Sequence, residues 1–232
     1  MNNSAVDVPV GERISPKIVD KNVICQEQSE HLSSPRYVTI FDFDDTLLPS
    51  SWLVHVLSTR EELTEKMKAE LRRVEQSAYS LLNCAIQSSQ VIIITNAEEG
   101  WVQNSCALFM PSVYSLLSKV VIVSARSRYE YVYPTDSAKW KELTFYDEIE
   151  AIRGKSGDFI SLLSIGDSLL EREAVFSYGR SNNMALAKSI KLIDVPTPAQ
   201  LVTQQELICN ALQSMIFSSD KLDLKLSVQV SV

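Results

Sequence analysis

The stretch Tyr37-Val-Thr-Ile-Phe-Asp-Phe-Asp-Asp-Thr-Leu-Leu-Pro49 decides the fold class of this chain. Its first half is apolar, β-branched and aromatic, which is typical of a parallel strand buried on both faces of a sheet. Its second half carries three acidic residues, Asp42, Asp44 and Asp45, where that strand is expected to end. In open α/β sheets, ligands bind just outside the carboxyl ends of the strands. The stretch therefore predicts an α/β sheet with a site beyond its first strand.

Asp42 and Asp44 are two positions apart, so their side chains point the same way in an extended backbone. Two carboxylates on the same side of a strand end repel each other, and folding alone gives no reason for them. A bound cation would offset that repulsion. The spacing therefore indicates a metal site.

The composition limits the classes of protein to be considered. The chain has 232 residues, 45% of them hydrophobic, which suits one α/β domain with tails or at most two small domains. It has 22 basic and 29 acidic residues, and a net charge of −7 argues against a nucleic-acid-binding surface. The four cysteines form no CxxC pair, so neither a zinc site nor a disulfide framework is indicated.

The N-terminal residues 1–13 are polar and lack the apolar core of a signal peptide. No apolar run reaches the length needed to span a membrane. We therefore expect a soluble, cytoplasmic protein with no membrane partner.

Further buried strands and helices are expected along the chain. The strands are expected at 90–96, 120–124, 159–167 and 189–193. The helices are expected over 63–85, from 97, from 111, from 136 or 137, over 169–178 up to Gly179, and over 199–217, with a loop at 125–135. Strands that alternate with helices predict an α/β fold with a doubly wound, Rossmann-like parallel sheet of about five strands.

The same pattern predicts three parts of the chain. Residues 1–34 show no lasting periodicity and are expected to form a flexible leader. Residues 35–220 are expected to form the α/β domain. Residues 221–232 are expected to form a C-terminal tail or an edge strand.

Polar residues also follow the other expected strands. Thr95 and Asn96 end the second strand and Asp167 ends the fourth, while Lys139 lies near the start of the helix before the fourth strand. The carboxylates suit Mg²⁺, which prefers oxygen ligands. A hydroxyl and an ammonium suit phosphate oxygens.

These residues lie in motifs that resemble those of the haloacid dehalogenase superfamily of phosphotransferases. Asp42-Phe-Asp44-Asp-Thr46 is similar to its first motif, DxDx[TV], and Val91-Ile-Ile-Ile-Thr95 is similar to its second. Lys139 fits the third, a lone lysine, and Gly166-Asp167-Ser-Leu-Leu-Glu171 fits the fourth, GDxxx[DE]. The resemblance covers roughly residues 36–195, and it rests on four motifs in order, each at an expected strand end.

The resemblance implies a role for each acidic residue. Asp42 would be the nucleophile that forms an aspartyl-phosphate, and Asp44 would protonate the leaving group and then activate water. Asp42, Asp44 through its backbone carbonyl, and Asp167 would bind Mg²⁺, with Glu171 in the inner or outer coordination shell. Glu171 could equally be an acid that complements the dipole of its helix.

Thr95, Asn96 and Lys139 would hold the phosphoryl group. Thr95 and Asn96 are also ordinary residues for the turn after a strand. Lys141 and Lys155 compete with Lys139 for the lysine role, and we favour Lys139 because it directly follows a capping residue.

In the superfamily, cap domains inserted after the first motif or after the third strand control access to the site. Asp42 and Thr95 are 53 positions apart, and Ser124 and Lys139 are 15 apart (95 − 42 and 139 − 124). Both spacings are short for a cap, so we expect a capless or minimally capped protein. An open site admits a large phosphorylated substrate such as a protein.

The resulting expectation is a Mg²⁺-dependent phosphatase that acts on phosphomonoesters. Two alternatives remain: a catalytically silent regulatory or scaffold protein with the same fold, and a phosphotransferase whose acceptor is not water.

Overall fold

The computed structural model describes residues 35–59, 62–154 and 158–227, all within the compact unit Ser33–Val232. These residues form a six-stranded, all-parallel sheet in the order β3-β2-β1-β4-β5-β6. The strands are β1 Arg36–Phe41, β2 Gln90–Thr95, β3 Val121–Ser124, β4 Ile160–Gly166, β5 Ala185–Lys191 and β6 Asp223–Lys225. The predicted doubly wound α/β fold is confirmed. The expected leader, 1–34, lies outside the described residues.

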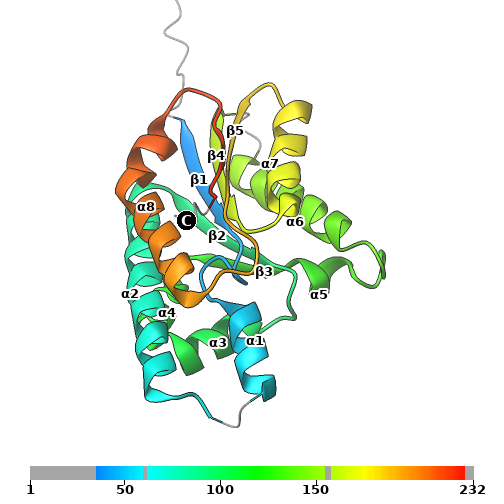
Figure 1. The fold of residues 1–232 in the computed structure, drawn as a ribbon. Coiled ribbons are helices and arrows are strands. Elements are labelled where there is room, and N and C mark those ends of the chain that lie inside the picture. The colour runs from blue at the N-terminus through cyan, green and yellow to red at the C-terminus, as the bar shows by residue number, and fades with distance from the viewer. Residues whose placement is uncertain (1–34, 60–61, 155–157, 228–232) are drawn as a thin grey trace, which may run out of the picture. The chain divides into compact units, whose positions relative to one another are not determined.

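Helices cover both faces of the sheet (Figure 1). In the part of the chain that the structure describes they are α1 Ser50–Thr59, α2 Glu65–Ser88, α3 Trp101–Phe109, α4 Pro111–Tyr114, α5 Ala125–Tyr129, α6 Ser137–Arg153, α7 Leu169–Ser181 and α8 Pro198–Phe217, with a 3-10 turn, η1, at Leu117–Lys119. The helices α2 and α8 pack on one face, and α6 and α7 pack on the other. The helices α1 and α3 lie beyond the end to which the strands point, at the bottom of Figure 1.

The alternation of side chains along the strands explains this layering. Phe41 and Ile93 point into the cluster beneath α2 and α8, whereas Ile40 and Ile92 point into the cluster beneath α6 and α7. Successive side chains of a strand point to opposite faces, and here both faces are covered. The continuous apolar runs of the sequence therefore become strands that are buried on both sides.

The ends of the two central strands, β1 and β4, lie where the strand order of the sheet changes direction. The chain builds outward from β1 through β2 to β3, and then returns to place β4 on the other side of β1. The register pairs Phe41 with Ile165, so Asp42 and Asp167 follow the ends of adjacent strands. Ligands bind at this reversal in doubly wound sheets, so the fold places both acids where a ligand is expected.

Three elements differ from the sequence-based expectation, the first two of which are α5 and β5. Residues 125–135 were expected to form a loop, but Ser124 accepts a hydrogen bond from the Ser127 amide and caps the short helix α5. The strand β5 begins at Ala185 rather than Ser189, and it includes the fully buried Lys188. The Lys188 ammonium donates to the carbonyls of Met215, Ile216 and Ser218 at the end of α8, which satisfies a charge that would otherwise exclude lysine from a core strand.

The helix α7 was expected to stop at Gly179, yet it continues to Ser181. A Cβ atom at Gly179 would lie 2.7 Å from the Cβ of Ala187 on β5. The glycine therefore allows close packing of helix on sheet, and it does not terminate the helix.

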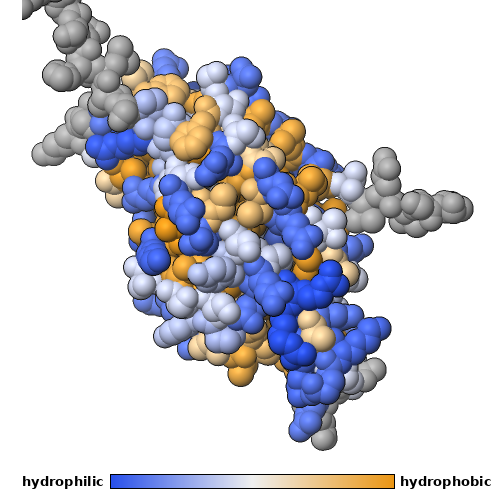
Figure 2. Space-filling model, turned by 90° about the vertical axis from the view of Figure 1, so that its left-hand side faces the viewer, coloured by the Kyte–Doolittle hydropathy of each residue, from blue (hydrophilic) through white to orange (hydrophobic). Residues whose placement is uncertain are grey.

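None of the described helices is long and apolar enough to cross a membrane. Hydrophilic and hydrophobic residues are interspersed over the face that Figure 2 shows.

We predict that Gly179→Ala destabilises the protein, although alanine favours helix by about 1 kcal/mol. The added methyl group overpacks the α7–β5 contact, which typically costs about 1–3 kcal/mol. The free energy of unfolding, measured in urea, should fall, and the double variant Gly179→Ala, Ala187→Gly should recover part of the loss. A more stable Gly179→Ala protein would show that the close contact has no energetic importance.

Candidate functional site

A buried lysine lies between two buried carboxylates at the centre of the site. The Lys141 Nζ atom is 2.5 Å from Asp42 Oδ1 and 2.5 Å from Glu171 Oε1. Asp42 follows β1, Lys141 lies in α6 and Glu171 lies in the first turn of α7. The Asp42 amide donates to the Ile165 carbonyl at 2.9 Å and so extends the hydrogen bonding between β1 and β4 by one residue. This contact holds the backbone that carries the Asp42 carboxylate.

The three charges have opposing effects on one another's pKa values. Burial raises the pKa of Asp42 well above its usual range, and the nearby ammonium of Lys141 only partly offsets this. Burial alone would lower the pKa of Lys141, but the two carboxylates raise it, so the ammonium stays charged. Burial disfavours the charged form of Glu171, yet Lys141 and Ser168 hold its pKa below the ordinary value. When both carboxyl groups are ionised, the single ammonium between them leaves a net negative charge in the site.

Asp44 has a different set of partners from Asp42. Its Oδ1 atom accepts hydrogen bonds from Ser50 Oγ at 2.5 Å and from the Trp101 indole Nε1 at 2.9 Å. Its Oδ2 atom accepts from Thr95 Oγ1 at 3.1 Å. The strand β1 ends at Phe41, and the charge of Asp44 lies close enough to Asp42 to raise the pKa of Asp42 further. The Asp42 carboxylate is thus paired with a cation, whereas the Asp44 carboxylate accepts hydrogen bonds only from neutral donors.

The turn that carries Asp44 is held in place from two directions. Asp45 adopts a left-handed conformation with φ of 53°, and its Oδ1 atom accepts from the Ser51 amide at 3.0 Å. From α8, the buried Gln205 Nε2 donates to the carbonyls of Thr46 and Leu47 at 2.9 and 3.1 Å. Gln205 is not recognisable from the sequence, because nothing local in the sequence links it to a turn 159 residues away.

Asp167 follows β4, and its backbone is also anchored by a lysine. Lys191 Nζ donates to the Asp167 carbonyl at 2.5 Å and to Asp194 Oδ1 at 2.5 Å. The Asp167 side chain accepts no hydrogen bond from another side chain in the residues that the structure describes. Burial, together with the charges of Glu171 and Asp45, raises the pKa of Asp167 to about 6. Asp167 therefore lies in a negative environment that a cation would relieve.

The donor chemistry suits Mg²⁺, but the described residues hold no group of three or more His, Cys, Asp or Glu side chains that could bind a metal ion. The four acids named from the sequence do not converge, because Asp44 is turned toward Trp101 and Glu171 is occupied by Lys141 and Ser168. Asp42 and Asp167 remain as carboxylate donors. The Asp44 carbonyl accepts no hydrogen bond within 35–59, 62–154 and 158–227. Two carboxylates and a carbonyl suit an ion that keeps several of its waters.

The side chain of Lys139 was expected to face the carboxylates, and this orientation is wrong. Its Nζ atom pairs with Glu142 at 2.8 Å on the surface of α6. Two helical positions turn a side chain by about 200°, so Lys139 and Lys141 point to opposite sides and only Lys141 enters the site. Lys155, the other alternative, lies outside the described residues.

Asn96 lies beside the site and contributes to its framework. Its Nδ2 atom donates to the Ser137 carbonyl at 3.2 Å, which ties the end of β2 to the start of α6. Its buried Oδ1 atom has no hydrogen-bond partner among the residues described. Of the two residues named for phosphate binding on β2, Thr95 reaches Asp44, and Asn96 contacts the backbone of α6.

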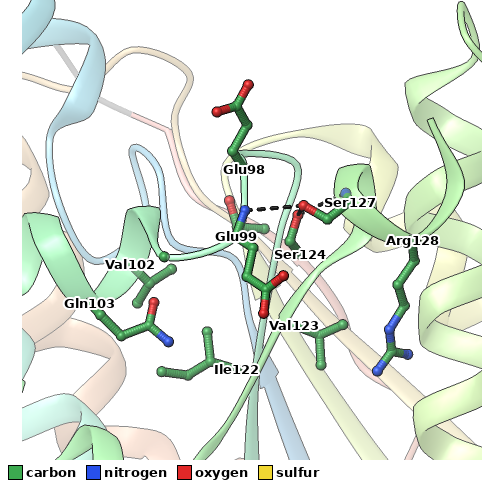
Figure 3. A pocket seen from close by; sticks show the side chains of 11 residues that line it. Glu98, Glu99, Val102, Gln103, Ile122, Val123, Ser124, Ser127 and Arg128 are labelled. Carbon is green, nitrogen blue, oxygen red and sulfur yellow. Dashed lines mark hydrogen bonds between the residues drawn. The ribbon is translucent and has the colours of Figure 1, made fainter. Parts of the chain in front are cut away.

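Two hollows border the strand ends. The smaller, of about 220 Å³, lies between α3 and α5 and is lined by Glu98, Glu99, Gln103 and Arg128 (Figure 3). It shares Thr95 with the site but contains neither Asp42 nor Asp44, so we do not assign the chemistry to it. The larger, of about 670 Å³, opens directly beside Asp44.

We predict that Lys141→Met destabilises the protein by about 3–5 kcal/mol, because it leaves two buried carboxylates without their common cation. Lys139→Met is the matched control on the same helix, and it should change the free energy of unfolding by less than about 0.5 kcal/mol. Both values come from urea unfolding followed by circular dichroism. If the two substitutions lowered the free energy of unfolding equally, the placement of Lys141 between the two buried carboxylates would be contradicted.

We also predict that Asp167→Asn raises the melting temperature at pH 7.5 in buffer without divalent cations. The folded pKa of about 6 exceeds the ordinary value of 3.8, so ionisation of Asp167 costs stability as the pH rises through that window. The variant cannot ionise at this position and avoids the cost. The difference should shrink as the pH falls from 6 toward 3.8, and it should disappear only below 3.8, where both the folded and the unfolded wild-type residue are protonated. A difference that does not change with pH would refute this electrostatic origin.

Comparison with known proteins does not identify a relative. No family model, no curated protein and no solved structure matches this chain.

Proposed function

We propose that this protein is a Mg²⁺-dependent phosphatase that hydrolyses phosphomonoesters through an aspartyl-phosphate. The observation that carries the proposal is the separation of two neighbouring carboxylates into different surroundings. Asp42 is paired with a buried ammonium, and Asp44 is held by Ser50, Thr95 and Trp101. A nucleophile and a proton-transferring group need this kind of division. The four motifs that resemble the haloacid dehalogenase superfamily support the same assignment.

Asp42 is suited to attack phosphorus through one of its two oxygens. Its Oδ1 atom is held by Lys141, whereas Oδ2 accepts no hydrogen bond in the described part of the chain. In the first step, the Oδ2–phosphorus bond forms as the bond from phosphorus to the leaving oxygen breaks. Asp44 donates its proton to that oxygen. In the second step, Asp44 takes a proton from water, the water oxygen attacks phosphorus, and Asp42 and phosphate are released.

Lys141 would supply a donor for the phosphoryl oxygens, and Thr95 would supply a second one if its hydroxyl turns from Asp44 to the substrate. An ammonium has three N–H donors, and Lys141 uses two of them on Asp42 and Glu171. Glu171 in turn is fixed by the amide of Ser168 at 3.1 Å, so it positions the lysine. Lys141 takes the role that the resemblance gave to Lys139, and Thr95 keeps its own. Phosphoryl transfer depends mainly on positioning and charge neutralisation, and these contacts supply both.

Asp42, Asp167 and the backbone carbonyl of Asp44 would hold Mg²⁺. The ion would supply positive charge against the phosphoryl oxygens, which is its usual part in phosphoryl transfer. The raised pKa values of Asp42 and Asp167 show that both carboxylates lie where added positive charge favours ionisation.

The described chain has two connections in which a lid over the proposed site would be expected. Between Asp42 and Thr95 the structure has α1 and α2, and α2 packs on the sheet through Leu71, Ala78 and Leu81. Between Ser124 and Lys141 it has α5 and the start of α6. Neither described connection forms a separate lid, so we propose a phosphorylated substrate that includes large molecules such as a protein.

We predict that Asp42→Asn lowers kcat for an aryl phosphate by on the order of 10³ or more, because an amide is a far poorer nucleophile. The fold should be retained, because the amide resembles the protonated acid that the raised pKa favours. Asp220→Asn, at an exposed position near the C-terminus, is the matched control and should keep full activity.

Turnover is to be measured with Mg²⁺ and again with excess EDTA, with the melting temperature recorded for each protein. Wild-type turnover by Asp42→Asn would remove Asp42 from the nucleophile role, and full activity in EDTA would remove the metal. A folded wild-type protein with no turnover of any phosphomonoester would favour the scaffold alternative. Faster product formation with added alcohols would favour transfer to an acceptor other than water.

A further inference from the structure

A groove runs from Asp44 along the surface between α1 and α3. Its volume of about 670 Å³ lies within the range of small-molecule sites. The residues that line it are Asp44, Ser50, Ser51, Val54, Asn96, Ala97, Glu98, Trp101 and Arg126. Asp44 lines the groove, so the group bonded to a phosphate whose leaving oxygen reaches Asp44 would extend into it.

The position of Trp101 beside Asp44 indicates which part of a substrate would contact the indole. Its Nε1 atom lies 2.9 Å from Asp44 Oδ1, and its side chain is 37% exposed. A leaving oxygen must come within hydrogen-bond reach of the Asp44 carboxyl group to receive its proton. The carbon next to that oxygen therefore lies beside the indole.

The opposite wall of the groove, from α1, carries two serines and one apolar side chain, Val54. Ser50, whose hydroxyl donates to Asp44, and Val54 are four positions apart on α1, so they share one face of that helix. Val54 is 64% exposed, which is unusual for a side chain that only fills a core. An indole and an isopropyl group thus flank the path away from Asp44.

The basic side chain that lines the groove is already paired with carboxylates, so it is not available to bind a second anionic group of a substrate. Arg126 pairs with Glu98 at 3.6 Å and with Glu130 at 2.9 Å, so two carboxylates already neutralise its guanidinium. Asp44 adds a further acid at the inner end. The lining therefore suits an uncharged, flat, apolar leaving group and disfavours one that carries additional phosphates.

We propose that this groove is the leaving-group subsite of the proposed phosphatase and that it takes the aromatic ring of a phosphotyrosine residue in a peptide. In phosphotyrosine the carbon next to the leaving oxygen belongs to the ring, so the ring lies against Trp101. Paired aromatic rings attract each other beyond the area that they bury. In phosphoserine the same position is a methylene group, which gains little from the indole. The inference rests on the proposed function, but binding tests it separately from turnover.

The experiment compares the affinities of benzylphosphonate and ethylphosphonate, two non-hydrolysable probes with the same anionic head group, by calorimetry with Mg²⁺. Benzylphosphonate should bind the wild-type protein about tenfold more tightly. The advantage should fall below about threefold in Trp101→Leu and in Val54→Ser. Leu207→Ala, which removes an exposed apolar side chain from α8, is the control and should keep the full advantage.

A second measurement compares kcat/KM for two peptides of one sequence, one with phosphotyrosine and one with phosphoserine. The ratio should fall in Trp101→Leu and Val54→Ser by about the factor seen in binding. Equal affinity of the two phosphonates for the wild-type protein, or an aromatic advantage that both variants retain, would overturn the subsite. Aromatic preference in binding without turnover of either peptide would support the groove as an aryl site and overturn the proposed hydrolysis.

Discussion

The ammonium of Lys141 between the carboxylates of Asp42 and Glu171 is the interaction on which the site depends. Transfer of these three charges from water into the protein interior is unfavourable, and the ion contacts offset that cost only when their geometry is good. The contacts therefore require β1, α6 and α7 to hold their side chains in register. When Asp42 is ionised, two carboxylates share one ammonium and the cluster is negative, which suits a site that binds a cation and a phosphoryl group together.

The second constraint is the turn that follows β1. Asp45 takes a left-handed conformation there, and Gln205 reaches from α8 to hold the carbonyls of the turn. Backbone strain of this kind persists only where surrounding contacts impose it. The turn moves Asp44 away from Lys141 and toward Trp101, so the two acids of one short motif take different surroundings.

Two buried lysines of β5 support the framework in different ways. Lys188 binds the carbonyls at the end of α8, and Lys191 binds the carbonyl of Asp167. Each ammonium compensates for its burial by donating to backbone oxygens. The strand next to β4 thereby fixes both the helix that supplies Gln205 and the loop that supplies Asp167.

The sequence by itself determined the parallel α/β fold, the strand positions and the polar residues Asp42, Asp44, Thr95 and Asp167 that follow the strands, because hydrophobic runs and their polar ends are local signals. It left the choice among the lysines open, since helix rotation decides whether Lys139 or Lys141 faces the strands. It did not reveal Trp101, Ser50 or Gln205 as partners of the turn, because those contacts join residues that are brought together only by the packing of α1, α3 and α8. The tertiary structure decided these partners because side-chain direction at a turn depends on the surrounding elements and not on sequence spacing.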